Sequence, residues 1–342
     1  MSKTASSLLS YIEQSGLLTG DETSKQHLIW NACFNSHIAN LSNVYSVQAF
    51  KPYYDDWRLN KVAVAPTFDV NDALDCIYCV LPKQKEAAQY QLALSIRHLK
   101  NEGLLLAIAE NEAGGKRLNK WFQELGLEPS TLSKSKCKIV WAYKTKLPNE
   151  EKISSWIENG SPRKIQTAYG EFLTKPGIYG WKKIDLGSQI LLDNLPDNLT
   201  GTGADFGCGY GFLSNAILRQ SKEITKLYAI DADYDALECS KKNLSDFPVP
   251  IEFLWLDLTR ASEKPMNLDW IIMNPPFHEG KETQANIGQL FIQRAAENLK
   301  VNGVLYMVAN AHLPYEKALQ AHFRQIEKLA EQEGFKVYKA VK

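Results

Sequence analysis

The sequence predicts an α/β protein made of two similar, mostly parallel α/β domains in tandem. Three observations predict this fold class. Short apolar runs of strand character alternate with segments of helix length along most of the chain, which is the pattern of βαβ units. The alternation is interrupted once and then resumes. The length of 342 residues is also too great for one ordinary domain and suits two.

The predicted strands are the apolar runs. In the first half they are residues 62–66, 76–81, 104–109 and 138–143. In the second half they are residues 204–207, 226–231, 251–257, 269–274, 304–310 and 335–341. Because helix-length segments separate most of them, neighbouring strands are expected to run parallel.

The interruption lies at residues 146–165, which contain two prolines, a glycine and dense charge but little apolar periodicity. We therefore predict a first domain over residues 1–150, a linker over residues 151–165 and a second domain over residues 166–342. A short helix is expected at residues 150–157, where the linker begins.

The two halves repeat the same order of features. In each half an aspartate opens a strand (Asp75 and Asp269), a helix follows, and a Lys-x-x-Gly turn leads into the next strand. The stretches Asp75–Lys144 and Asp269–Lys339 have nearly the same length. This repetition indicates an internal duplication. Only the second half has a glycine-rich loop after its first strand, so the first domain is expected to be a degenerate copy without a cofactor site.

The glycine-rich loop carries the clearest chemistry. Residues 205–211 read Asp-Phe-Gly-Cys-Gly-Tyr-Gly and stand between a predicted strand and a predicted helix. Glycines at alternate positions allow positive φ angles and bring bare main chain close to a ligand, to which the helix presents its positive N-terminal end. The spacing does not fit a dinucleotide fingerprint, because Phe212 stands at the position of the third glycine, and no P-loop string is present.

The remaining pattern, acid-x-Gly-x-Gly-x-Gly, resembles the first motif of the Rossmann-like methyltransferases that use S-adenosyl-L-methionine. The resemblance implies that Asp205 organises the loop amides and faces the amino-acid end of this cofactor. It also implies that the rest of the loop lies against the cofactor, through Gly207, Cys208, Gly209 and Gly211.

Two further acidic residues end the next predicted strands. Asp231 lies about 20 residues after the loop, where a carboxylate can accept hydrogen bonds from both ribose hydroxyls. Asp257 ends the third strand, where the family has a residue that accepts a hydrogen bond from the adenine amino group. Each acid alone could be a solvated strand end or a helix cap. Their shared place at the carboxyl ends of consecutive strands favours a cofactor site.

A second motif follows the fourth strand of this half. The strand at residues 269–273 leads into Asn274-Pro275-Pro276-Phe277. The prolines fix the exit from the strand and leave carbonyl acceptors exposed, the amide offers another acceptor, and the aromatic ring can stack on a flat base. Two acceptors can hold a planar amino group with its lone pair turned toward a methyl sulfonium, without a strong base. The tetrapeptide resembles amino-group methyltransferases that act on adenine N6, guanine N2 or a protein glutamine amide.

Longer strings narrow the resemblance, and they are residues 176–179, 184–192, 274–280, 309–315 and 334–338. Together with the length and the duplicated first half, they make the chain similar to the ribosomal RNA small subunit methyltransferase C family. The similarity implies two tandem Rossmann-like methyltransferase domains, the second with a mostly parallel seven-stranded sheet. It also implies methylation of guanine N2, at position 1207 of 16S ribosomal RNA, with S-adenosyl-L-methionine as the cofactor.

Four residues are assigned to substrate binding. Tyr179 and the basic residues Lys182 and Lys183 stand in the lead-in to the second domain, and His278 follows the tetrapeptide. The expected partner is 16S ribosomal RNA, either naked or within the assembled small ribosomal subunit. In the first domain, residues 81–83 read Leu-Pro-Lys where the Asn-Pro-Pro-Phe motif would stand, so this domain is expected to bind RNA or to support folding.

Three alternatives stay open. One is a guanine-N2 methyltransferase of 23S ribosomal RNA, which shares most of these strings. Another is a protein glutamine-amide methyltransferase, although such enzymes typically have tyrosine where Phe277 stands. The alternative from a different class is a catalytically silent RNA-binding assembly protein, against which the intact Asn274 and the intact glycine loop speak.

Composition limits the setting. The chain has 39 basic and 39 acidic residues, which excludes a polycation that coats nucleic acid through its overall field but not a local basic patch. The first twenty residues carry no apolar core of signal-peptide length, and no apolar run approaches the ~18 residues that a membrane span needs. The CxxC at residues 76–79 lies in a predicted strand, where its sulfurs point to opposite faces, so no metal site is expected. We expect a cytoplasmic monomer with no membrane or metal partner.

Overall fold

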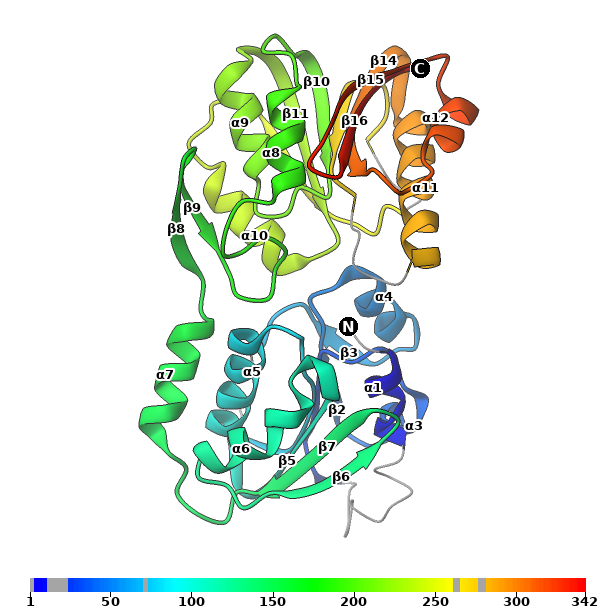
Figure 1. Cartoon of the computed structure of the whole chain (residues 1–342). Coiled ribbons are helices and arrows are strands. Elements are labelled where there is room, and N and C mark those ends of the chain that lie inside the picture. The colour runs from blue at the N-terminus through cyan, green and yellow to red at the C-terminus, as the bar shows by residue number, and fades with distance from the viewer. Residues whose placement is uncertain (1–2, 11–23, 70–72, 261–264, 276–280) are drawn as a thin grey trace. The chain divides into compact units, whose positions relative to one another are not determined.

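The computed structural model describes the chain except for residues 1–2, 11–23, 70–72, 261–264 and 276–280. It divides into two compact units, Met1–Ser161 and Pro162–Lys342, which Figure 1 shows in blue to green and in green to red. The predicted fold class is confirmed, because each unit contains a mostly parallel seven-stranded sheet with helices on both faces.

The first unit begins with short elements that supply one edge of its sheet. Its elements are α1 (Lys3–Ser7), β1 (His27–Trp30), α3 (Ser36–Ala39), β2 (Val44–Val47), α4 (Lys51–Leu59), β3 (Ala63–Ala65), β4 (Leu74–Val80), α5 (Lys85–His98), β5 (Leu99–Glu110), the 3₁₀ helix η2 (Asn111–Ala113), α6 (Gly115–Glu124), β6 (Ser130–Lys134), β7 (Cys137–Tyr143) and α7 (Glu150–Gly160). The strand order is β3-β2-β1-β4-β5-β7-β6, in which β7 runs antiparallel to β5 and β6.

The second unit begins with an antiparallel hairpin and continues with a sheet of its own. Its elements are β8 (Arg163–Thr167), β9 (Gly170–Thr174), α8 (Leu186–Asp193), β10 (Thr200–Phe206), α9 (Phe212–Gln220), β11 (Glu223–Asp231), α10 (Tyr234–Asn243), β12 (Ile251–Trp255), β13 (Leu268–Met273), α11 (Lys281–Asn298), β14 (Leu299–Asn310), α12 (Glu316–His322), β15 (Gln325–Gln332) and β16 (Phe335–Val341). The strand order is β12-β11-β10-β13-β14-β16-β15, with β16 antiparallel to its neighbours.

Alternate residues of the central strands enter cores on the two faces of each sheet. In β4, Cys79 packs with residues of α5, α6 and α7, whereas Cys76 packs with residues of α1, α3 and α4. In β13, Ile272 packs beside α8, α9 and α10, and Met273 beside α11 and α12. The predicted placement of the two cysteines on opposite faces is therefore confirmed, and both are free thiols.

The two seven-stranded sheets have the same strand order when the strands are numbered within each sheet. They also share an ion pair at the start of the fourth strand, formed by Asp75 with Lys100 in the first unit and by Asp269 with Lys300 in the second. Each aspartate also accepts a backbone N–H bond at the start of the first strand of its own sheet, from Gln26 just before β1 at 2.9 Å and from Thr202 in β10 at 2.7 Å. These matching details support the predicted internal duplication.

The structure differs from the predicted linker at residues 151–165. Those residues are mostly helix α7, which packs against α5 in the first unit, and the division falls after Ser161. Ile153 is fully buried, and the Trp156 ring lies edge-on to Trp121 at 6.3 Å. The charged residues of the segment cover one side of the helix, and its few apolar residues face the core. Because charged residues outnumber apolar ones, the composition of this amphipathic helix is like that of a linker.

Candidate active site

The glycine loop lies where β10 ends and α9 begins. Gly207, Gly209 and Gly211 have φ angles of 77°, 56° and 85°, a region that side-chain-bearing residues rarely adopt. At Gly211 a Cβ atom would also lie 2.7 Å from the Ser240 hydroxyl of α10. No side chain caps α9, since Gly211 is its N-cap. Within the first turn the Ser214 amide interacts with the Asp205 carboxylate, and the lack of a cap at Gly211 leaves the positive end of the helix suited to an anionic group.

Asp231, at the end of β11, holds this loop. Its Oδ2 accepts a hydrogen bond from the Gly209 N–H at 2.7 Å, and its Oδ1 accepts one from the Asp233 N–H at 2.8 Å. Burial raises the pKa of Asp231, and the backbone donors oppose that rise. Each carboxylate oxygen has a second lone pair, so these bonds leave room for the ribose contact predicted from the sequence. Holding the loop is a further role that the sequence did not predict.

Asp205 lies beneath the loop and is 1% exposed. Its Oδ2 accepts a hydrogen bond from the Ser214 hydroxyl of α9 at 2.7 Å, whereas its Oδ1 is buried and has no partner among the described residues. Burial is the main cause that raises the pKa of Asp205 to about 7, and the charge of Asp231 adds to it. An unpartnered acceptor of this kind suits a cationic group of a ligand.

We predict that Asp205→Asn makes the ligand-free protein more stable at pH 8. The pKa of Asp205 rises from 3.8 to about 7 on folding, so the native state keeps a proton that the unfolded chain releases as the pH rises from about 4 to 7. The free energy of unfolding therefore falls over that range, and asparagine avoids a loss on the order of 1–4 kcal/mol. Urea unfolding of both proteins at pH 5 and pH 8 measures the difference.

The gain in the free energy of unfolding should be smaller at pH 5, because the parent protein loses most of this stability as the pH rises from about 5 to 7. Asp193→Asn is the matched control, since this aspartate of α8 is exposed and should show no such dependence. A variant at Asp205 that is less stable than the parent at both pH values would contradict the prediction.

Two other predicted cofactor residues are buried near the same edge of the sheet. The Asp257 Oδ1 accepts hydrogen bonds from the Thr259 N–H and hydroxyl, at 2.9 Å and 2.6 Å. Burial and the nearby carboxylates raise the pKa of the Cys208 thiol well above its ordinary value, so it stays neutral. The Cys208 N–H bonds to the Ile230 carbonyl at 2.9 Å. Asp257 is a well-held acceptor, and Cys208 contributes packing and backbone.

Asn274 follows β13 at this edge of the sheet. Its Nδ2 donates to the Asp185 Oδ2 and to the Ser188 hydroxyl, both at 2.8 Å. Its Oδ1 is buried and has no hydrogen-bond partner among the described residues. The next residue, Pro275, is also buried. The amide thus has both of its donors bound and its acceptor open, which suits an incoming N–H group.

The predicted substrate residues are partly described. The Tyr179 hydroxyl donates to the Asp185 Oδ1 at 2.5 Å, which links Tyr179 to the Asn274 network. Lys182 and Lys183 are exposed, and the Lys182 ammonium lies 4.7 Å from the centre of the Trp181 ring. No described contact joins the two lysines to Asn274. Three predicted residues, which are Pro276, Phe277 and His278, lie outside the described residues.

Asp185 and Ser188 are functional candidates that the sequence analysis missed. Both stand in the string at residues 184–192, where Asp185 is the N-cap of α8 and accepts a hydrogen bond from the Ser188 N–H at 2.9 Å. An Asp-x-x-Ser pattern before an apolar run is the ordinary signature of a helix start. Because capping explains the pattern, no second role for either residue is predicted from it.

The first unit has different residues at the corresponding positions. Trp30 pairs with Val47 and Cys79 as Phe206 pairs with Ile230 and Met273, and these pairs align Asn31 with Gly207, Gln48 with Asp231 and Val80 with Asn274. The buried Gln48 amide and the fully buried Trp57 indole both donate to the Ala32 carbonyl at 2.9 Å. In α1, the Ser6 hydroxyl accepts from the Cys33 N–H at 3.0 Å. In the first unit, side chains of the protein itself therefore hydrogen-bond to the loop that follows β1.

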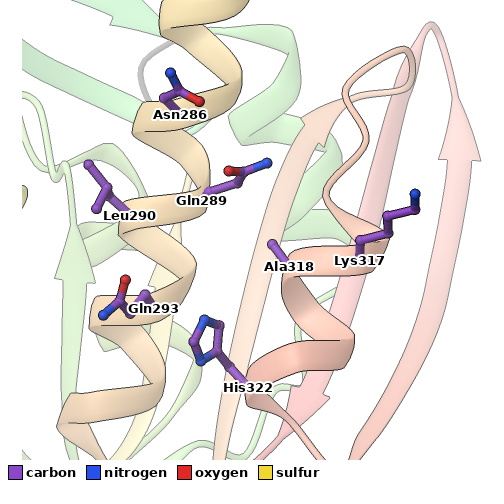
Figure 2. A pocket seen from close by; sticks show the side chains of 7 residues that line it. All are labelled: Asn286, Gln289, Leu290, Gln293, Lys317, Ala318 and His322. Atoms are coloured by element: carbon purple, nitrogen blue, oxygen red, sulfur yellow. The ribbon is translucent and has the colours of Figure 1, made fainter.

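A separate hollow lies between α11 and α12 in the second unit, as Figure 2 shows. It is lined by Asn286, Gln289, Leu290, Gln293, Lys317, Ala318 and His322. None of the predicted site residues lines it, so it is distinct from the Asn274 network. Among the helices of the described residues, none has the length and apolar character needed to cross a membrane.

Comparisons with known proteins agree with this division of the chain. The Methyltransferase small domain matches residues 169–339, and the Methyltransferase small domain N-terminal matches residues 17–159. Ribosomal RNA small subunit methyltransferase C of Shewanella pealeana is 32% identical over 276 residues, which are 80% of this chain and 79% of the relative. The protein of the same name from Acinetobacter baumannii (strain AYE) is 31% identical over 75% of this chain and 76% of its own length.

One solved structure covers both units. The T. thermophilus 16S rRNA N2 methyltransferase for guanine 1207, in complex with AdoMet and guanosine, superposes with a TM-score of 0.81. It covers 97% of this chain and 91% of its own, at 19% sequence identity. At this level of identity the match establishes the shared two-domain fold.

Proposed function

Since the chain belongs to the ribosomal RNA small subunit methyltransferase C family, we propose that it transfers a methyl group from S-adenosyl-L-methionine to N2 of a guanine in 16S ribosomal RNA. The observation that carries this proposal is the Asn274 amide, whose donors are bound and whose buried oxygen has no hydrogen-bond partner among the residues that the structure describes. Next to the glycine loop, that arrangement fits the exocyclic amino group of a base.

The residues present fit the cofactor. The start of α9, where Gly211 provides no side-chain cap, suits its carboxylate. The Asp205 Oδ1, which has no hydrogen-bond partner among the described residues, suits its cationic amino-acid end. Asp231 and Asp257 would hold the ribose and the adenine, respectively. When bound, S-adenosyl-L-methionine supplies a methyl group activated by a sulfonium. The residues of the chain have to exclude water, hold the glycine loop in place and orient the guanine amino group, which is the nucleophile.

Orientation of the guanine falls to Asn274 and Pro275. The Asn274 Oδ1 accepts one N–H of the guanine amino group, and the Pro275 carbonyl accepts the other, so the nitrogen lone pair is left to face the methyl carbon. Once the guanine nitrogen has received the methyl group, its surplus proton would leave to water. These acceptors also stabilise the positive charge that develops on nitrogen, so the site requires no strong base.

We propose guanine 1207 as the target, the position named for the T. thermophilus enzyme of the same fold, and the cytoplasm as the setting. Mass mapping of N2-methylguanine in small- and large-subunit RNA from a gene-deletion strain tests the target. Loss at this 16S guanine is the expected result, and loss confined to 23S RNA would contradict it. Methylation assays with naked 16S RNA and with small subunits then separate the two substrate forms.

We also propose that the first domain has no cofactor site and instead supports folding or holds RNA. Val80 provides no acceptor at the position of Asn274, and Gln48 replaces the acidic Asp231. Trp57 and α1 fill the space beside the loop. In this proposal each protein molecule therefore binds one molecule of cofactor, which calorimetric titration measures.

We predict that Trp57→Ala destabilises the first domain by about 3–5 kcal/mol. The indole is fully buried, lies edge-on to Phe34 at 5.2 Å and donates to the Ala32 carbonyl. Its removal leaves a cavity, and the Ala32 carbonyl keeps only its bond from the Gln48 amide. Urea unfolding measures the loss. Leu59→Ala on the same helix is the control, because Leu59 is 75% exposed and should change the free energy of unfolding by less than about 0.5 kcal/mol.

A further inference from the structure

The two ends of an asparagine amide have nearly the same shape but opposite hydrogen-bonding character. A rotation by half a turn about the last side-chain bond would exchange the Oδ1 and Nδ2 of Asn274. In one orientation the group that faces the substrate accepts an N–H bond, and in the other it presents donors to the guanine amino group. Neighbouring groups must therefore decide which orientation is populated.

Asp185 and Ser188 determine which orientation of the Asn274 amide is populated. Both N–H groups of Asn274 are bound, one to the Asp185 Oδ2 and one to the Ser188 hydroxyl, each at 2.8 Å. A carboxylate is an acceptor only, so the reversed amide would set its own oxygen against a carboxylate oxygen. Serine could serve either orientation, because its hydroxyl can also donate. Asp185 is thus the neighbour that discriminates between the two orientations.

Asp185 is itself held from two sides. The Ser188 N–H donates to its Oδ2 at 2.9 Å, and the Tyr179 hydroxyl donates to its Oδ1 at 2.5 Å. Burial, together with the hydrogen bond to Asp185, raises the pKa of Tyr179, so this hydroxyl remains a donor throughout the neutral range. The carboxylate therefore has a fixed plane and a fixed distance to Asn274. The contact joins residues that are 89 positions apart in the chain.

We propose that Asp185 is a positioning residue that fixes the amide of Asn274 with its oxygen toward the substrate amino group. This inference rests on the proposed function, because it concerns the acceptor that methyl transfer uses. Asp185 contacts neither substrate nor cofactor in this account and acts through Asn274. Its role as the N-cap of α8 is separate and must be kept in any test.

The decisive variant is Asp185→Ser. Serine is as good an N-cap as aspartate, so the start of α8 should persist, but the shorter side chain no longer reaches Asn274. We expect kcat for methylation of 16S RNA to fall about 10- to 100-fold, with an unchanged melting temperature and an unchanged Kd for S-adenosyl-L-methionine. Asn149→Ser, which exchanges the N-cap of α7, is the matched control and should leave kcat unchanged.

Asp185→Asn separates hydrogen-bond geometry from folding. Its oxygen can take the place of Oδ2, and its amino group can donate to the Tyr179 hydroxyl, so we expect kcat within about threefold of the parent. Ser188→Ala keeps the cap and one of the two acceptors, and it should cost only a few-fold. This variant still tests the network if Asp185→Ser proves unstable.

Three results bear on the inference. Full activity of a stably folded Asp185→Ser protein would overturn it, and so would an Asp185→Asn protein as slow as Asp185→Ser. A double variant at Asp185 and Ser188 as slow as Asn274→Ala would support it, since neither acceptor then orients the amide. The parent protein is assayed beside the variants, so failure of the parent to methylate RNA would refute the proposed function instead.

Discussion

Asn274→Ala is expected to slow methyl transfer by about 100- to 1,000-fold, the cost typical of deleting one preorganised polar group from an active site. The substitution removes the buried acceptor Oδ1, the group we propose to hold the amino group of the target guanine. Affinity for S-adenosyl-L-methionine should not change, because the glycine loop and Asp231 do not hydrogen-bond to this side chain. Transfer of labelled methyl groups to RNA and calorimetric titration with the cofactor measure the two quantities.

Asn286→Ala is a suitable control for this substitution. Asn286 is an exposed asparagine of the same unit, and it lines the hollow between α11 and α12. Its replacement should leave both the rate and the affinity unchanged. An Asn274→Ala protein that retains more than about a third of the parent rate would show that its amide oxygen contributes little, since one hydrogen bond to a developing charge is worth more than that.

Asp231→Asn is expected to weaken cofactor binding by about 10- to 100-fold, which is the value of a charge-assisted hydrogen bond. Both oxygens of Asp231 accept backbone N–H groups, from Gly209 and from Asp233. Asparagine offers one acceptor and one donor, so in either orientation its amino group meets an N–H that it cannot accept. The loop then loses a bond that holds Gly209 in place beside the cofactor site. Calorimetric titration with S-adenosyl-L-methionine measures the effect.

The first domain contains a related substitution. Gln48 stands at the position of Asp231, and its oxygen accepts from the Phe50 N–H at 2.9 Å, as the oxygen of Asp231 accepts from Asp233. The Gln48 Nε2 donates to the Ala32 carbonyl, whereas the other oxygen of Asp231 accepts the Gly209 N–H.

The control for Asp231→Asn is Asp246→Asn, at an exposed position of the second domain, which should bind the cofactor like the parent. Unchanged affinity in Asp231→Asn would refute the role of Asp231 in holding the loop.

Local strings were enough to predict four strands of the first sheet, six strands of the second and the order of the catalytic motifs. The strands missed are β1, β2 and the edge strand β6 in the first sheet, the edge strand β15 in the second, and the hairpin strands β8 and β9. β1 and β2 are only four residues long each, too short for a pattern of alternation to stand out. β15 has largely exposed, charged residues, because it pairs along one edge with β16 and only partly faces the core. Apolar periodicity detects burial, and an exposed edge strand buries little.

The features of the candidate site also divide into those that local sequence predicts and those that only the fold reveals. Asn274, Asp231 and the loop glycines are recognisable because their chemistry lies within a few consecutive residues. The contact between Asp185 and Asn274 joins separate strings of the chain, and only the fold brings them together. The raised pKa of Asp205 likewise follows from burial and from the charge of Asp231 on the neighbouring strand. Long-range pairing of this kind is a property of the sheet.

The helix α7 has a consequence for how the protein is made. Because it packs on α5, every residue that the first unit buries precedes Pro162 in the chain. Domains generally fold as units during synthesis, the N-terminal one first, so the first unit has its whole core on hand before the catalytic residues leave the ribosome. A gene fragment for this domain should therefore extend through Gly160. One that stops at residue 150 would discard Ile153 and Trp156 and leave the apolar side of α5 open to aggregation.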